Sequence, residues 1–332
     1  MNRLYGGIEA GGTKFICVVG TGPDEILAEA RLPTSTPQET LQRALDFFRP
    51  YLTKTDQRLP KSSRLRKFSL QNGVLAAVGI GAFGPLDLDP RSPTYGFITT
   101  TPKSGWAQVD LCGEIGRDLG IPVALDTDVN TAAIGERFWI AENRLLDPFL
   151  YITVGTGIGV GGWVNGRPLH GLVHPEAGHS FIPHSWDEDP FEGICPYHGD
   201  CLEGLASGPA IARRWGIRAE NLPADHPGWE LEARYLALGI CNLIYALSPQ
   251  RIVLGGGVLG HPGLIERIRQ QVTRLLNGYI HSDCLLEGID AYIVSPGLGG
   301  RAGVLGALAM AMALEDAALF HQDGLYASAH RS

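Results

Sequence analysis

The stretch "RLYGGIEAGGTKFICVVG", Arg3 to Gly20, has the pattern of a strand, a glycine turn and a second strand. Near the middle of the chain, "FLYITVGTGIGVGGWVNG", Phe149 to Gly166, repeats this pattern, again with glycine and threonine in the turn. A pattern that recurs within one chain indicates a weak internal duplication. We therefore predict two related lobes.

Strands and helices alternate in both halves of the chain. Apolar spacing predicts helices over residues 38–52 and 229–247, and a helix of small residues from about residue 303. Ser207 is placed to cap another helix, with Pro209 in its first turn. Alternating elements indicate the α/β class. A length of 332 residues exceeds the usual single core, which also favours two lobes.

The net charge of −8 argues against a nucleic-acid partner, because neutralising phosphates requires clustered Lys and Arg. The stretch from Lys54 to Gln71 is basic and has the composition of either a nucleic-acid arm or a solvated loop. The acidic balance of the whole chain favours the loop. The longest run of small apolar residues, 302–314, is shorter than the roughly 20 residues that span a bilayer, so we expect no membrane partner.

Six cysteines could form three disulfides in a secreted protein. The first apolar stretch has neither the basic flank nor the cleavage site of a signal peptide. Four cysteines lie singly in apolar segments, as buried thiols do: Cys17, Cys112, Cys241 and Cys284. We expect reduced cysteines and a cytoplasmic protein.

A cluster of metal-ligand residue types lies in "HPEAGHSFIPHSWDEDPFEGICPYHGDCLEG", residues 174–204. Cys195, His198 and Cys201 are spaced three apart around proline and glycine, which predicts a knuckle and not a helix. His179 is available upstream as a fourth ligand. Two thiolates and two imidazoles suit tetrahedral zinc, and a closed set of four leaves no position for a reacting water.

Alternatives to a structural zinc site remain open at this point. His170, His174 and His184 are also available, so spacing alone does not select the histidines. A catalytic metal or a loop without metal would use the same residues. A redox role is less favoured, because the motif is not Cys-x-x-Cys.

Three glycine turns follow predicted strands: "EAGGTK", "VGTGIGVGG" and "LGGGVLG". Together their backbone N–H groups could surround an anion, although each alone has the pattern of a tight hairpin. None matches the P-loop pattern, and "VGTGIGVGG" runs from strand to strand, which counts against a dinucleotide-binding unit.

The stretch "LDTDVN" places Asp126 and Asp128 where a strand ends and a helix begins. Catalytic groups of α/β sheets favour this position. The same residues could instead cap the helix. Both interpretations are carried forward.

In this order, the motifs "GGIEAGGTKF", "DTDVN", "VGTGIGVGG", "HPEAGH" and "CPYHGDCLEG" resemble those of the ROK family of sugar kinases, from about residue 4 to about residue 312. The stretch "TTPKSGW", residues 100–106, is similar to its bacterial fructokinase branch. The resemblance implies a two-lobed actin/hexokinase-like, ribonuclease H-like α/β fold. Its N-terminal lobe would comprise residues 1–127 and about 305–332. Its C-terminal lobe would comprise residues 128–304, with a zinc knuckle at 179–201.

The resemblance also implies residue roles. Asp128 matches the catalytic base, and Asn130, Glu176 and His179 match residues that hold the sugar. The implied ligands of a structural Zn²⁺ are His179, Cys195, His198 and Cys201. The implied ATP and phosphate contacts are Gly11, Gly12, Thr13, Lys14, Gly155, Thr156, Gly157, Pro209, Gly255, Gly256 and Gly257.

Two departures from the family pattern are visible. The wider kinase superfamily has Asp where this chain has Glu9, which leaves a contact of Glu9 with Mg²⁺ open. A histidine replaces one cysteine of the usual zinc motif. Because His179 lies three residues after Glu176, we predict that chelating zinc loosens sugar binding before it alters the ATP contacts.

The implied activity is ATP- and Mg²⁺-dependent phosphorylation of a hexose, with D-fructose as the expected acceptor. Mannose, glucose or an N-acylated amino sugar are alternative acceptors, and a non-catalytic sugar sensor is an alternative in another class. ROK repressors carry a DNA-binding segment before this body. Here the first glycine turn lies at residues 11–12, so we expect no repressor. The resemblance also implies a homodimer.

Overall fold

The computed structural model describes residues 3–52, 73–101 and 103–316. The basic stretch from Lys54 to Gln71 lies outside these residues. The described chain forms two compact units. Unit 1 takes its described residues from 1–144, 166–174 and 301–332, and unit 2 consists of residues 145–165 and 175–300. None of the described helices is long and apolar enough to cross a membrane.

The sheet of unit 1 is built from β1 (Arg3–Ala10), β2 (Lys14–Gly20), β3 (Ile26–Pro33), β4 (Val74–Ala82) and β7 (Val123–Thr127). Their order is β3-β2-β1-β4-β7. β1 pairs antiparallel with β2 and parallel with β4, and β4 pairs parallel with β7. The carboxyl ends of β1, β4 and β7 therefore lie at one edge of the sheet, where α/β proteins place their ligands.

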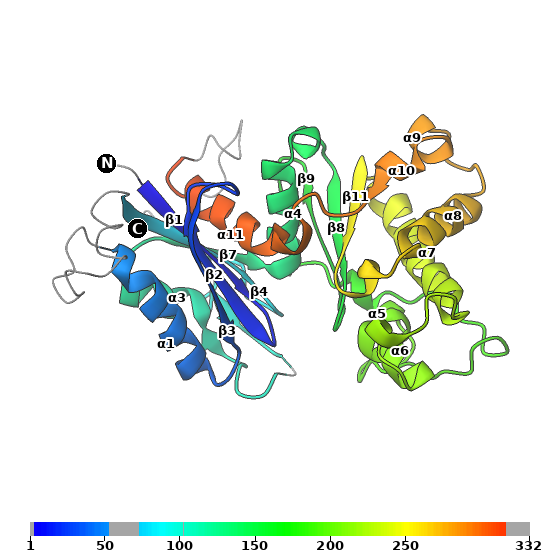
Figure 1. Cartoon of the computed structure of the whole chain (residues 1–332), viewed down its shortest axis with the longest axis horizontal. Helices are drawn as coiled ribbons and strands as arrows, with labels where there is room; N and C mark the ends of the chain where they lie inside the picture. The colour runs from blue at the N-terminus through cyan, green and yellow to red at the C-terminus, as the bar shows by residue number, and fades with distance from the viewer. Residues whose placement is uncertain (1–2, 53–72, 102, 317–332) are drawn as a thin grey trace. The chain divides into compact units, whose positions relative to one another are not determined.

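Helices cover both faces of this sheet (Figure 1). They are α1 (Pro37–Phe48), α3 (Leu111–Leu119), α4 (Asp128–Trp139) and α11 (Ala302–Ala313), with short turns η1 (Arg49–Tyr51) and η2 (Ala141–Asn143) and the strand pair β5 (Phe97–Ile98) and β6 (Val109–Asp110). Apolar side chains of α1 and α3 pack on one face, and Phe48 and Ile115 are fully buried there. α4 and α11 pack on each other and on the sheet.

Glycines let α11 approach both β4 and α4 closely. A methyl group on Gly79 of β4 would lie 1.9 Å from the carbonyl oxygen of Ala307. One on Gly306 would lie 1.7 Å from the carbonyl oxygen of Thr131. Both distances are far below van der Waals contact, so these positions admit only glycine without a backbone shift. This contact explains why the predicted C-terminal helix is composed of small residues.

Unit 2 is built around four strands of a second sheet, β8 (Phe149–Val154), β9 (Ile158–Val164), β11 (Arg251–Gly255) and β12 (Ile293–Val294). The fifth strand of this sheet, β10 (Arg167–Pro168), falls within residues 166–174, which are grouped with unit 1. The strand order is β10-β9-β8-β11-β12. β8 pairs antiparallel with β9 and parallel with β11, and β11 pairs parallel with β12. The hairpin β8–β9 thus occupies the same place in its sheet as β1–β2, as the repeated sequence pattern predicts.

In the sequence, the first three helices of unit 2 lie between β10 and β11, and the next three lie between β11 and β12. They are α5 (Leu202–Ala206), α6 (Gly208–Trp215), α7 (Gly228–Leu247), α8 (Leu264–Leu276), α9 (Asp283–Leu286) and α10 (Ile289–Tyr292), with short turns η3 (Ala177–His179), η4 (Ala219–Asn221), η5 (Val258–Gly260) and η6 (Gly299–Arg301). Ser207 caps α6 by accepting from the N–H of Ala210, as predicted.

The six cysteines are free, so the three possible disulfides do not form. Cys17, Cys112 and Cys241 are buried thiols, as predicted. The same expectation is wrong for Cys284, which is exposed. Its apolar neighbour Leu285 is the residue of the four-residue helix α9 that turns inward.

Candidate functional site

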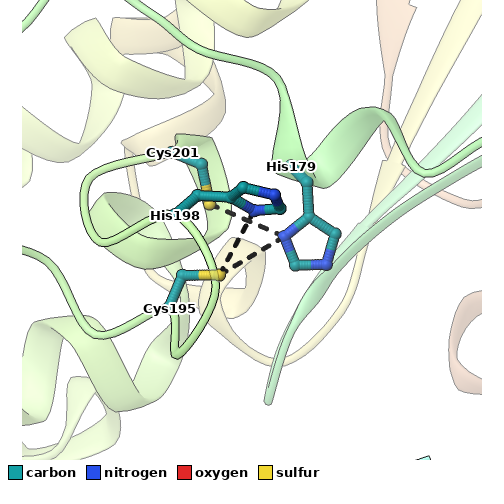
Figure 2. A group of neighbouring side chains, drawn as sticks. All are labelled: His179, Cys195, His198 and Cys201. Atoms are coloured by element: carbon teal, nitrogen blue, oxygen red, sulfur yellow. Dashed lines mark hydrogen bonds between the residues drawn. The ribbon is translucent and has the colours of Figure 1, made fainter. Parts of the chain in front are cut away.

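Four side chains converge in unit 2 as the sequence predicts: His179, Cys195, His198 and Cys201 (Figure 2). The Nδ1 atom of His179 lies 3.6 Å from both sulfur atoms, and Nδ1 of His198 lies 3.6 Å from Sγ of Cys195. All four ligand atoms lie within 4.8 Å of one another. Sulfur and nitrogen ligands at ordinary zinc distances and tetrahedral angles are about 3.6 Å apart. The residues therefore fit a zinc ion.

Local backbone structure positions these ligands. Cys195 and Gly199 exchange two backbone hydrogen bonds, and Gly199 has the positive φ of +63° that the tight turn needs. Cys201 is the N-cap residue of α5, where Sγ accepts from the N–H of Gly204 at 3.4 Å. His179 ends the short turn η3. The segment from Cys195 to Cys201, here called the metal knuckle, is a turn and not a helix, as predicted.

The thiol of Cys201 is a weak acid in this setting. Burial, together with the neighbouring Cys195, raises the pKa of Cys201 to about 11, although the N–H of Gly204 acts in the opposite direction. A metal ion has to displace the proton from this thiol, so metal affinity rises with pH.

The three other histidines of this region have partners of their own. Nε2 of His174 accepts from the backbone N–H of Leu86 at 3.1 Å. His184 contacts the Asp200 carboxylate at 3.0 Å. His170 pairs with Asp126 (see below). The structure thus selects the two histidines of the metal set, which spacing alone leaves open.

Glu203 is a residue of this site that the sequence analysis missed. One carboxylate oxygen lies 4.0 Å from Nε2 of His179, on the side of the ring opposite the metal ligands. The other accepts from the backbone N–H of Ile158, at the start of β9, at 2.9 Å. The 4.0 Å separation from Nε2 is too long for a hydrogen bond, so the carboxylate can act on the His179 ring only as a nearby charge. Its position two residues after Cys201 was the available signal, but nothing in the spacing relates it to Ile158.

The predicted phosphate turns of unit 2 come together. In the first turn, the N–H of Gly155 donates to the oxygen of Gly157 at 2.9 Å. The N–H of Gly208, the first residue of α6, donates to the oxygen of Gly155 at 2.8 Å. A methyl group on Gly256 would lie 2.3 Å from the oxygen of Val154. Two glycine turns and a helix N-terminus therefore meet at the carboxyl ends of β8 and β11, an arrangement suited to binding an anion.

The remaining residues of unit 2 that are predicted to contact ATP lie in these turns and at the head of α6. Thr156 and Pro209 are exposed at the first turn and at the head of α6. Gly255 is buried at the end of β11, and Gly257 is exposed. Glu176, predicted to bind the sugar, is exposed at the N-cap of η3. Its backbone carbonyl oxygen accepts from the N–H of His179 at 2.9 Å.

The other phosphate turn lies in unit 1, between β1 and β2. The N–H of Gly11 donates to the oxygen of Lys14 at 3.0 Å, and Gly12, Thr13 and Lys14 are exposed. Glu9 precedes the turn. Burial raises the pKa of Glu9, although Lys14 and the N–H of Val304 act in the opposite direction.

Asp126 and Asp128 have different environments at the carboxyl end of β7. Asp126 is fully buried. Asp128 is the first residue of α4, is partly exposed, and accepts from the N–H of Val129 at 2.9 Å. The helix cap is Thr127, whose Oγ1 accepts from the N–H of Asn130 at 3.1 Å. The alternative in which Asp126 or Asp128 caps the helix is thus wrong, because the N-cap residue of α4 is Thr127.

The chain belongs to the ROK family, whose model matches residues 5–313. It is 45% identical over 308 residues to a putative fructokinase of Bacillus subtilis (strain 168), covering 93% of this chain and 95% of that protein. It is 42% identical over 318 residues to a fructokinase of Zymomonas mobilis, covering 95% and 98%. The ROK hexokinase of Thermus thermophilus has the same fold, with a TM-score of 0.72, 26% identity and coverage of 94% and 99%. The family and the fold predicted from the motifs are confirmed.

Proposed function

We propose that this chain is an ATP-dependent fructokinase that converts D-fructose to fructose 6-phosphate. Family membership over residues 5–313, with named fructokinases among its relatives, supports the activity. The observation that carries the reaction is the position of Asp128. It stands at the head of α4, at the sheet edge where β1 leads into the Gly11–Gly12 turn and β7 ends.

Asp128 would act as the general base. Phosphoryl transfer depends on positioning and charge neutralisation more than on covalent chemistry. The carboxylate accepts the proton of the acceptor hydroxyl as that oxygen attacks the γ-phosphorus, while the bond from phosphorus to the leaving ADP oxygen breaks. General-base help of this kind is typically worth about 10²–10⁴ in rate.

Asn130 would hold the sugar together with Glu176. The amide nitrogen of Asn130 donates to Oδ1 of Asp126 at 2.9 Å and to the oxygen of Leu169 at 3.2 Å. Both N–H groups are thereby engaged. These two bonds fix the orientation of the Asn130 amide at the start of α4.

ATP would be bound through its phosphates. In unit 2, the N–H groups of Gly155 and Gly208 bond within the protein and hold the turn against the head of α6. The donors for an anion would be other backbone N–H groups of the turns at Gly155–Gly157 and Gly255–Gly257. In unit 1, the Gly11–Lys14 turn offers further donors and the Lys14 charge. Mg²⁺, when bound with ATP, supplies charge neutralisation for the phosphates.

Zinc would have a structural role at the metal knuckle. Four protein ligands complete a tetrahedron, so no position is left for a reacting water. The ion would hold His179, and through the backbone of η3 the loop that carries Glu176. The predicted homodimer, the cytoplasmic location and the absence of a nucleic-acid partner also remain proposals.

The test is ATP consumption by the purified protein with Mg²⁺ against fructose, mannose, glucose, N-acetylmannosamine and N-acetylglucosamine. Asp128→Asn, which keeps the shape of the side chain, is the matched variant. We expect the highest kcat/KM with fructose and a loss of about 10²–10⁴ in kcat for the variant. Preference for another sugar contradicts the fructose assignment alone. Sugar binding without turnover would instead indicate a sensor.

A further inference from the structure

The segment Leu169–His174, here called the histidine strap, belongs to unit 1, whereas residues Pro175–Gly300 belong to unit 2. Its middle is open to solvent: Leu172 and Val173 are exposed. Its two histidines have partners within unit 1. In the sequence, the strap ends two residues before Glu176.

His170 is held on the buried carboxylate of Asp126. Nε2 of His170 lies 3.1 and 3.0 Å from the two oxygens of Asp126. The Asp126 side chain is fully buried, whereas that of His170 is 37% exposed. A buried carboxylate needs charge or hydrogen-bond partners to compensate for its lost hydration. His170 is the partner of opposite charge when its ring is protonated.

The second anchor of the strap is His174. Its side chain is buried, and its Nε2 accepts from the backbone N–H of Leu86. Gly84 makes room for the ring, because a methyl group there would lie 3.2 Å from Nε2. The strap is thus bound to the end of β7 through His170 and to the loop after β4 through His174.

The same carboxylate organises the turn that carries the proposed base. Oδ1 of Asp126 accepts from the N–H of Thr127 at 2.7 Å and from the amide of Asn130 at 2.9 Å. The Asn130 amide also donates to Leu169 of the strap at 3.2 Å. Asp126, Asn130 and the strap therefore form one hydrogen-bonded network around the start of α4, where Asp128 stands.

We propose that His170, acting through Asp126, is a positioning residue for the acceptor sugar. It keeps the Asn130 amide oriented and the strap in place, and it does not itself take part in phosphoryl transfer. This inference rests on the proposed sugar-kinase function. It predicts that loss of His170 raises KM for the sugar and leaves KM for ATP unchanged.

The ionisation of His170 gives the network a pH signature. Burial and the charge of Arg167 lower the pKa of His170. Attraction to Asp126 and the hydrogen bonds with Asp126 raise this pKa by more, so the net shift is upward. Tyr95 also interacts electrostatically with Asp126. A raised histidine pKa means that the charged pair is complete below the ordinary pKa of about 6.5 and is lost as pH rises through the folded value.

The experiment uses the full-length enzyme and the hexose that it phosphorylates best. His170→Leu removes the donor, His170→Gln keeps an N–H donor without the charge, and His281→Gln is the control at an exposed histidine of unit 2. We expect His170→Leu to raise KM for the sugar about 10- to 100-fold, the effect of losing a hydrogen bond to a charged group. KM for ATP should stay within about twofold. His170→Gln, which restores a donor but not the charge, should recover only part of the loss in KM for the sugar.

The pH profile separates positioning from simple stability. In the wild type, kcat/KM for the sugar should fall as pH rises through the pKa of His170, and this limb should be absent in His170→Gln. Equal rises in both KM values, an unchanged sugar KM in His170→Leu, or the same alkaline limb in His170→Gln would overturn the proposal. If His170→Leu does not fold, the His170→Gln profile decides.

Failure of the proposed function is distinguishable from failure of this inference. A wild-type enzyme without turnover on any sugar contradicts the kinase proposal. Calorimetric binding of fructose to the wild type and His170→Gln, measured across the same pH range, then tests the positioning role. Absence of a difference between them, or of binding itself, counts against it.

Discussion

The hairpins β1–β2 and β8–β9 share a sequence pattern and a place in their sheets, yet they are supported in different ways. In unit 1, the carboxylate beside the turn belongs to the hairpin itself: Glu9 on β1 lies against the head of α11, where the N–H of Val304 acts to lower the pKa of Glu9. In unit 2, the carboxylate comes from outside the hairpin. Glu203, on α5 beside the metal knuckle, accepts from Ile158 at the start of β9.

Each carboxylate is packed against a glycine. A methyl group on Gly303 would lie 2.8 Å from the Glu9 carboxylate, and one on Gly157 would lie 2.5 Å from the Glu203 carboxylate. The first hairpin thus depends on helix packing, and the second depends on a loop that a metal ion is expected to hold. The two hairpins have the same arrangement of strands, but the carboxylates that pack against them come from different parts of the chain.

Metal removal should produce the largest difference between the hairpins. A ligand at 1,000 times its Kd stabilises the folded state by about 4 kcal/mol, so chelation should remove several kcal/mol from unit 2. We expect faster hydrogen exchange in β8–β9 and unchanged exchange in β1–β2. The sequence predicts loss of sugar binding before loss of ATP contacts, but the Glu203 link to β9 leads us to expect KM to rise for both. Equal exchange changes in the two hairpins would contradict the comparison.

Gly157→Ala should have the next largest effect. The added methyl displaces the Glu203 carboxylate and breaks its hydrogen bond with Ile158, at a cost of about 1–3 kcal/mol. Gly155→Ala is the matched control in the same turn, because a methyl group there meets no atom within 4 Å. Thermal unfolding measures both variants. Equal stability of the two would show that Glu203 does not support this hairpin.

Gly303→Ala should have the smallest effect, about 1 kcal/mol, because the Glu9 side chain can shift in part. Replacing Glu9 with Ala in the same chain should recover stability, since the new methyl then fills space that the carboxylate leaves. Gly300→Ala, where a methyl group contacts nothing within 4 Å, serves as the control. Thermal unfolding of the wild type, the two single variants and the double variant forms a double-mutant cycle. Additive changes in the free energy of unfolding would argue against direct contact between Glu9 and the methyl group at position 303.

Much of the fold and the metal site was predictable because both are encoded locally. The α/β alternation follows from apolar spacing, and the repeated strand–turn–strand pattern predicts the duplicated hairpins. Cys195, His198 and Cys201 lie within one short turn, so their spacing already indicates a tetrahedral metal site. The position where a strand ends and a helix begins pointed to Asp126 and Asp128 together, and only the resemblance to the ROK family distinguished Asp128 as the base.

The tertiary structure alone decided which groups from distant parts of the chain meet. It assigned His179, and not the three other nearby histidines, to the metal set. It brought Glu203 to Ile158, across 45 residues, and His170 to Asp126, across 44 residues. It also showed that Thr127, and not its acidic neighbours, caps α4. Such contacts depend on strand order and helix packing, which hydrophobic periodicity does not specify, because periodicity records only which face of an element is buried.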